Sequence, residues 1–235
     1  AGTYYTNLIT YPSDVDASKY MNIDGTRTRL KSGDLTAEFE NPFWDVNKNA
    51  GNDKTDRLSG SVTISADPYK WLNLSTITGI DHFVTEGFYM IHPYSRLGFY
   101  TNGFLSTYIQ NFRSINGTFK ATVKKTIAKK LTNTLVTGFY FEDSKRSIPS
   151  QAGEQFFEKD FISIVNTAPL TRNANLVREQ IRKVRGFANY AASYNNMLYA
   201  SFSLIREGVS PLTSKFYDKQ PFFTYGSASG SFIFT

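Results

Sequence analysis

The chain has 235 residues, 26 Lys and Arg against 20 Asp and Glu, 20 Phe, 15 Tyr and no cysteine. The lack of cysteine excludes a disulfide framework and a thiolate metal site, and no apolar run approaches the roughly 18 residues of a transmembrane helix. Basic and acidic residues are interspersed, so the net charge of +6 does not indicate a nucleic-acid partner. One lysine cluster stands out and is interpreted as a solvated turn: Lys124, Lys125, Lys129 and Lys130.

The first clear secondary-structure signal follows a stretch, residues 1–56, that is rich in Asp, Asn, Thr and Gly and is predicted as a loop region. From Leu58 to Ala66, apolar and hydroxyl-bearing side chains alternate with the period of two that is typical of a β-strand. A turn at residues 67–70 and a second alternating segment, residues 71–81, complete a hairpin.

The same pattern returns in two further hairpins and a last strand. The strands are predicted at residues 115–124 and 134–142, at residues 184–193 and 198–205, and at Phe222–Thr235. We expect the polar face to line the interior of a barrel, with Ser59, Ser61, Thr63, Lys120 and Lys124 on it. The other face should meet lipid, with Val62, Ile64, Phe119 and Val123 on it.

Short and long connections alternate along the chain. The predicted long loops are residues 83–114, 143–183 and 207–221, and a loop helix is predicted within residues 170–185 from its apolar spacing. Bacterial outer-membrane barrels combine tight periplasmic turns with long extracellular loops and aromatic residues near strand ends. The sequence therefore predicts an all-β fold: an antiparallel transmembrane β-barrel section with about seven strands.

Catalytic chemistry is poorly represented. The two histidines, His82 and His92, are interpreted as exposed loop residues, and the carboxylates Glu154 and Glu158 as solvated loop charges. No phosphate-binding loop, nucleophile elbow or zinc signature is present in the sequence. We expect neither an enzyme nor a bound metal or cofactor.

Several motifs occur in an order that carries a family resemblance. Asn41–Asn49 resembles the NPYW-x-x-x-K-N element of SusC/RagA-like TonB-dependent transporters. Residues 57–65, 71–74 and 79–81 then resemble the family's R-x-x-G-N-x-S-L, D-W-L-x-L and G-x-D elements. Residues 185–190, 201–208 and 222–229 are similar to three later strand motifs of that family.

The resemblance implies a bacterial outer-membrane barrel of roughly 22 strands, plugged by a domain that this chain does not contain. It also implies import of oligosaccharides or peptides, a SusD-like surface lipoprotein as partner, and energy supplied through TonB. Residues 1–56 would be an extracellular loop region with the NPFW element, and residues 57–235 barrel strands and loops in contact with lipid. Stacking and charge favour four substrate-binding candidates: Phe43, Trp44, Tyr94 and Arg96.

A second function stays open at this point. A soluble or surface-attached all-β carbohydrate-binding module could use the same aromatic residues as a platform and core. Such a module should be monomeric without detergent, whereas a barrel section with outward Leu58, Val62 and Ile64 should aggregate.

Overall fold

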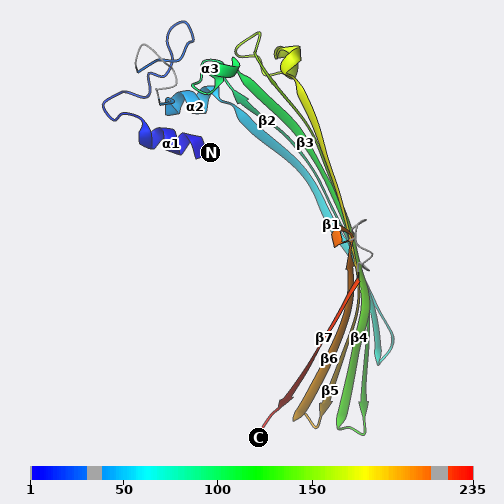
Figure 1. The fold of residues 1–235 in the computed structure, drawn as a ribbon. Helices are drawn as coiled ribbons and strands as arrows, with labels where there is room; N and C mark the ends of the chain where they lie inside the picture. Colours follow the sequence, from blue (N-terminus) through cyan, green and yellow to red (C-terminus); the bar gives the residue numbers. More distant parts are fainter. Residues whose placement is uncertain (1, 31–38, 213–221, 235) are drawn as a thin grey trace. The chain divides into compact units, whose positions relative to one another are not determined.

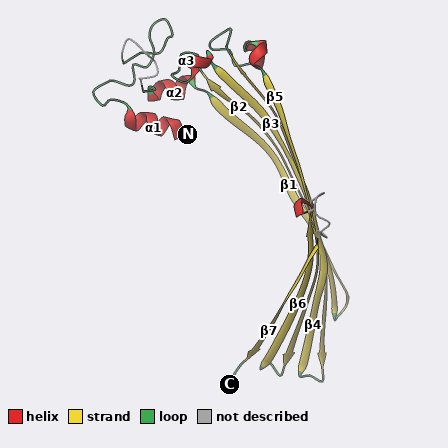
Figure 2. Ribbon diagram, viewed as in Figure 1, coloured by secondary structure: helices red, strands yellow, loops and turns green. Residues whose placement is uncertain are grey.

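The computed structural model describes residues 2–30, 39–212 and 222–234. Its main element is an antiparallel sheet of seven strands (Figures 1 and 2). Each strand pairs with its neighbour in the sequence, in the order β1 to β7, so the sheet is a meander. The strands are β1 Gly51–Tyr69, β2 Leu72–Ile91, β3 Phe104–Ile127, β4 Leu131–Glu154, β5 Asn173–Tyr194, β6 Leu198–Val209 and β7 Phe222–Phe232. The predicted all-β class and strand number are confirmed.

The helices of the described residues are short and lie between or before strands. They are α1 Gly2–Thr10, α2 Pro42–Lys48, α3 Gly98–Thr101 and the 3₁₀ turns η2 Ile164–Asn166, η3 Pro169–Thr171 and η4 Ser210–Leu212. None of those described is long and apolar enough to cross a membrane.

Two of the three tight turns form where the sequence predicts them, whereas the first lies at residues 70–71 and not at 67–70, because β1 continues to Tyr69. In the turn after β3, Ala128 and Lys129 have φ of 52° and 56°, and in the turn after β5, Asn195 and Asn196 have φ of 51° and 57°. Two successive left-handed residues give a hairpin turn that matches the twist of the flanking strands.

The predicted long loops are wrong in length, because the strands continue well into them. The first connection shrinks to the residues between Ile91 and Phe104, and the second to those between Glu154 and Asn173. The loop helix predicted within residues 170–185 is also wrong, since β5 begins at Asn173. β1 begins at Gly51, inside the segment predicted as a loop, and most of the predicted loop 207–221 lies outside the described residues.

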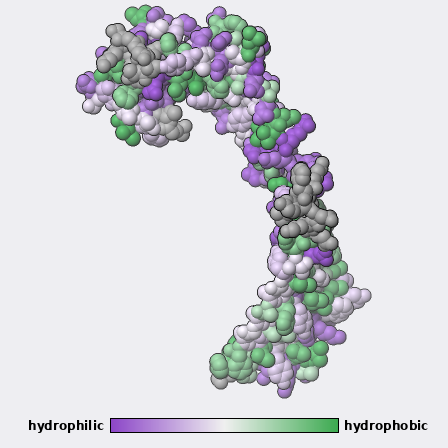
Figure 3. Space-filling model, viewed as in Figure 1, coloured by the Kyte–Doolittle hydropathy of each residue, from purple (hydrophilic) through white to green (hydrophobic). Residues whose placement is uncertain are grey.

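In β6 and β7, cross-strand contacts place the serine side chains together on one face, as the alternating pattern predicts for these two strands. Where β6 pairs with β7, Ser201 is opposite Ser229 and Ser203 opposite Ser227, with hydroxyl oxygens 2.7 Å and 2.6 Å apart. The intervening residue, Phe202, points to the other face. Hydrophobic surface is uncovered over the strands near the C-terminus (Figure 3).

Contacts group the chain into two compact units, one with residues 1–56, 84–111 and 147–177, the other with residues 57–83, 112–146 and 178–235. The buried hydrophobic side chains among the described residues are Trp44, Met90, Leu105 and Phe156, all in the first unit. The second unit instead exposes large apolar side chains along its strands, including Leu58, Val62, Ile64, Phe119, Phe202 and Leu204. In that unit the sheet is a single layer, and side chains on both of its faces are exposed.

Candidate functional site

The NPFW element begins α2, and the side chain of its first residue is used for internal hydrogen bonds. Asn41 is the N-cap: its side-chain oxygen accepts hydrogen bonds from the backbone N–H of Phe43, at 2.8 Å, and of Trp44, at 3.3 Å. Its amide nitrogen donates to the hydroxyl of Tyr11 and to the carbonyl of Ala17. Pro42 takes the first helical position, where its fixed φ suits a helix and its missing N–H has no intrahelical acceptor.

Trp44 joins α2 to the turn after β2. Its side chain is fully buried, and its indole N–H donates to Ser95 Oγ at 2.9 Å. Ser95 in turn donates to the side-chain oxygen of Asn49, which also accepts from the backbone N–H of His92. This chain of bonds fixes the two segments against each other and gives the buried indole N–H and the Ser95 hydroxyl their partners.

A buried ion pair lies beside this network. Arg27 Nη1 is 3.4 Å from Glu40 Oε1, and both side chains are almost wholly buried. The other carboxylate oxygen of Glu40 accepts from the backbone N–H of Arg96 at 2.6 Å. Burial raises the pKa of Glu40, and the nearby Arg27 charge opposes that shift.

His92 is buried and neutral at physiological pH. Burial lowers its pKa to about 4, with the charge of Asp160 acting in the opposite direction. Its Nδ1 accepts from the backbone N–H of Tyr94 at 3.1 Å, so the ring proton is on Nε2, 3.6 Å from Asp160 Oδ1. A hydrogen bond from Lys48 lowers the pKa of Asp160 and keeps it ionised. The sequence interpretation of His92 as an exposed residue is therefore wrong.

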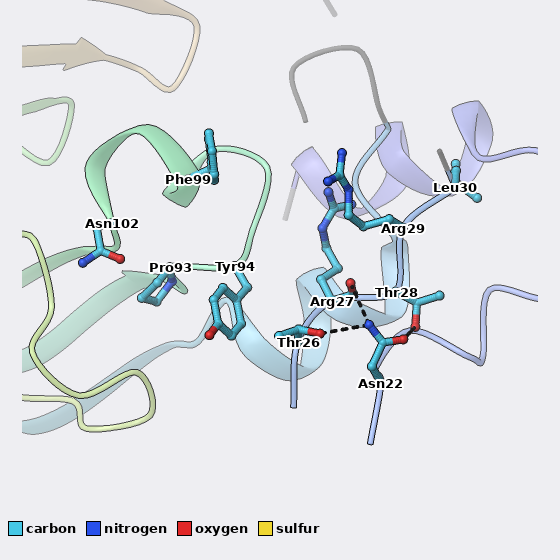
Figure 4. A pocket seen from close by; sticks show the side chains of 10 residues that line it. All are labelled: Asn22, Thr26, Arg27, Thr28, Arg29, Leu30, Pro93, Tyr94, Phe99 and Asn102. Atoms are coloured by element: carbon cyan, nitrogen blue, oxygen red, sulfur yellow. Dashed lines mark hydrogen bonds between the residues drawn. The ribbon is translucent and has the colours of Figure 1, made fainter. Parts of the chain in front are cut away.

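A cleft of about 760 Å³ opens beside these contacts within the first unit (Figure 4). Figure 4 shows Tyr94 and Phe99 from one segment and Arg27 and Arg29 from another on its walls. The lining residues are Asn22, Thr26, Arg27, Thr28, Arg29, Leu30, Pro93, Tyr94, Phe99 and Asn102. Aromatic faces, a guanidinium and amides in one concave site suit stacking and hydrogen bonding with a peptide or sugar.

The structure brings the four predicted site residues into one region but gives them different surroundings. Tyr94 lines the cleft, with the Lys159 ammonium 4.3 Å from its ring centroid. Arg96 lines a smaller cavity of about 280 Å³, and Phe43 is 42% exposed on α2. Trp44 is buried, which leaves it a packing role.

Sequence reasoning did not find Arg27, Arg29, Phe99 and Asn102. These residues lie in stretches without periodicity or motif, so only the folded chain brings them together. No group of three or more His, Cys, Asp or Glu side chains able to hold a metal occurs among the described residues.

The polar face of the second unit carries a set of paired charges. Lys183 of β5 lies 3.3 Å from Glu142 of β4, and Arg185 of β5 lies 2.5 Å from Glu207 of β6. Glu142 also accepts from the hydroxyl of Tyr140. Opposite charges on adjacent strands compensate one another, so this part of the face is polar without strong net charge.

Neither a family model nor a curated protein matches the sequence. Solved structures do match the fold, each over 89% of this chain. They include the RagAB peptide importer in its closed-closed state (TM-score 0.73, 14% identity), the RagAB peptide transporter (0.70, 13%) and the importer in its open-open state (0.70, 14%). The match covers 23% of each of those chains, so this chain spans less than a quarter of their length. Its fold is that of a section of their β-barrel, as the motif resemblance predicts.

Proposed function

We propose that the chain is a wall section, with attached loops, of a SusC/RagA-like TonB-dependent transporter in the bacterial outer membrane. The observation that carries this proposal is the match of 89% of the chain to RagAB importer structures. The exposed apolar face of the second unit supports it, because a water-soluble module would leave Leu58, Val62 and Ile64 uncovered at high cost. In this role the chain supplies shape and contacts, and catalyses no bond chemistry.

The proposed cargo is a peptide or an oligosaccharide, with a SusD-like surface lipoprotein as partner and TonB as the source of energy. The RagAB structures are described as a peptide importer, which favours peptides as the first class to test. Within this chain, the cleft with Tyr94 and the neighbouring Arg96 and Phe43 are the proposed contacts for cargo or partner. A peptide offers carbonyls and carboxylates to the Arg side chains and aromatic groups to Tyr94.

The cargo proposal is tested by uptake in a strain that depends on this transporter. We expect Tyr94→Ala to reduce growth on peptides from a casein digest several-fold while leaving the amount of protein in the outer membrane unchanged. Phe161→Ala is the matched control, because Phe161 is also an exposed loop aromatic of the first unit but does not line the cleft. Equal growth of both variants would remove the cleft from the cargo path, and growth on oligosaccharides alone would exclude peptides.

The proposed topology places the short turns in the periplasm and the long connections outside. An impermeant amine reagent should then modify Lys145, which is exposed in β4, on intact cells and spare Lys70 and Lys129 until the membrane is broken. Labelling of Lys129 with Lys145 protected would invert the topology. Equal labelling of all three would support the soluble module.

A further inference from the structure

The short turns of the second unit form one continuous edge, which we call the turn rim: residues 69–72, 124–131 and 193–198. Backbone hydrogen bonds connect its parts, from Lys124 N–H to the Trp71 carbonyl at 2.8 Å and from Asn195 N–H to the Lys130 carbonyl at 2.7 Å. These bonds hold the backbone of the rim together, so its lysines are attached to one connected edge of the sheet.

The turn rim is strongly basic. Residues 118–141 hold five lysines and no acidic residue, and residues 186–205 hold no charged residue. Lys70 adds a further charge, and the nearby carboxylate of Asp67 accepts a hydrogen bond from the Asn73 amide. All the rim lysines are exposed, and none forms an ion pair within the described parts of the chain: Lys70, Lys124, Lys125, Lys129 and Lys130.

Away from the rim, several charged side chains of the same unit are paired across strands. Arg57 bonds the carboxylate of Asp81 through two nitrogens, each at 2.8 Å, and the pairs of β4, β5 and β6 described above follow the same rule. The five rim lysines, by contrast, lie close together on one edge of the sheet without a carboxylate partner, where a bound anion could neutralise them.

Apolar and aromatic groups adjoin these lysines. Tyr69 and Trp71 stack with ring centroids 5.3 Å apart, and both are about half exposed, as are Tyr194 and Leu198. Lys125 shares a strand face with Phe119 and Val123, at the end of that apolar row. A lysine in this position can lay its aliphatic stem on apolar surface and extend its ammonium group into a headgroup layer.

We infer that the turn rim binds the phosphate groups of anionic glycerophospholipids in the leaflet that the short turns reach. This inference rests on the proposed function, since it requires the apolar strand face to lie in a bilayer. The aromatic rings would occupy the polar boundary of the bilayer and the lysines would contact phosphates just beyond it. Such contacts would fix the depth at which the barrel wall sits.

The inference is tested with the full-length protein in nanodiscs and in detergent. Binding of phosphatidylglycerol and of phosphatidylcholine is measured by native mass spectrometry for the wild type and for the triple variant K125Q/K129Q/K130Q. Each lysine near an anionic surface contributes about fivefold to binding, so the triple variant should lose on the order of 100-fold for phosphatidylglycerol alone. K125R/K129R/K130R should bind as the wild type does, which separates charge from misfolding.

The matched control is K19Q/K54Q/K145Q, which removes three exposed lysines elsewhere and should bind phosphatidylglycerol normally. Equal loss in the control, or no preference for phosphatidylglycerol over phosphatidylcholine, overturns the inference. Binding of lipopolysaccharide in place of phosphatidylglycerol also overturns it, because the rim would then lie in the outer leaflet. A protein that stays monomeric without detergent contradicts the proposed function, whereas a detergent-dependent protein without lipid preference contradicts only this inference.

Discussion

Gly138 in β4 lies beneath the ring of Phe187 from β5, and replacing it with alanine tests the packing of the polar face. A Cβ atom on Gly138 would lie 2.3 Å from the backbone oxygen of Phe119 and 2.6 Å from a ring carbon of Phe187. The ring can rotate away, but the oxygen belongs to the neighbouring strand β3 and moves only if the sheet shifts. We therefore expect Gly138→Ala to lower the free energy of unfolding by about 2 kcal/mol, within the range for overpacked sites.

Gly60→Ala in β1 is the control, because no atom lies within 4 Å of a Cβ built there. It should be neutral or stabilising by about 0.4–1 kcal/mol, since alanine restricts the unfolded chain. Urea titrations of folding into phosphatidylcholine vesicles, followed by tryptophan fluorescence, measure both changes. The double variant with Phe187→Leu should stay destabilised, because the clash with the backbone remains. Equal midpoints for Gly138→Ala and Gly60→Ala would refute this reasoning.

Three further predictions concern the strand faces, a turn and the loop histidine. Val62→Arg should cost about 2–4 kcal/mol near the bilayer midplane and Thr63→Arg much less in the same folding assay; equal tolerance would contradict the face assignment. Ala128→Asn with Lys129→Gly should raise stability by about 1–2 kcal/mol, because both positions have positive φ; a lower urea midpoint would exclude strain there. Burial lowers the pKa of His92 to about 4 from 6.5, so stability that is complete above pH 6.5 should fall as the pH falls toward 4. Trp44 emission in a Trp71→Phe background should report this change, and a profile unaltered by His92→Gln would assign it to another group.

The hairpin turns were predictable because alternation stops there and turn-forming residues intervene, as at Asn195 and Asn196. The ends of the strands away from these turns were not, because their residues alternate poorly and side-chain pairing supports them instead. In the segment predicted as a helix, Glu179 lies 3.6 Å from Arg146 and Gln180 donates to Asp143, both on β4. These contacts join residues more than 30 positions apart, so a local reading of apolar spacing could not anticipate them.

The candidate site was predictable only in location. The aromatic and basic residues of the sequence predicted a site near Tyr94 and Arg96, and in the structure each of these two residues lines a cavity. Burial was the missing information: Trp44 and His92 both look like surface residues in a polar stretch, yet each is enclosed by segments distant in the sequence.

Three residues of the element that carries the family resemblance, Asn41, Trp44 and Asn49, are occupied by internal contacts. Asn41 caps α2 and bonds two other segments, Trp44 is buried, and Asn49 accepts hydrogen bonds from two groups of the neighbouring turn. None of these groups is then left to recognise cargo. The side chains that line the cleft come instead from residues 22–30 and 93–102, which contain no family motif. In the proposed transporter, contacts to cargo should therefore come from the cleft wall and not from Asn41, Trp44 or Asn49, and substitutions in the cleft wall should change substrate preference more than substitutions at those three positions.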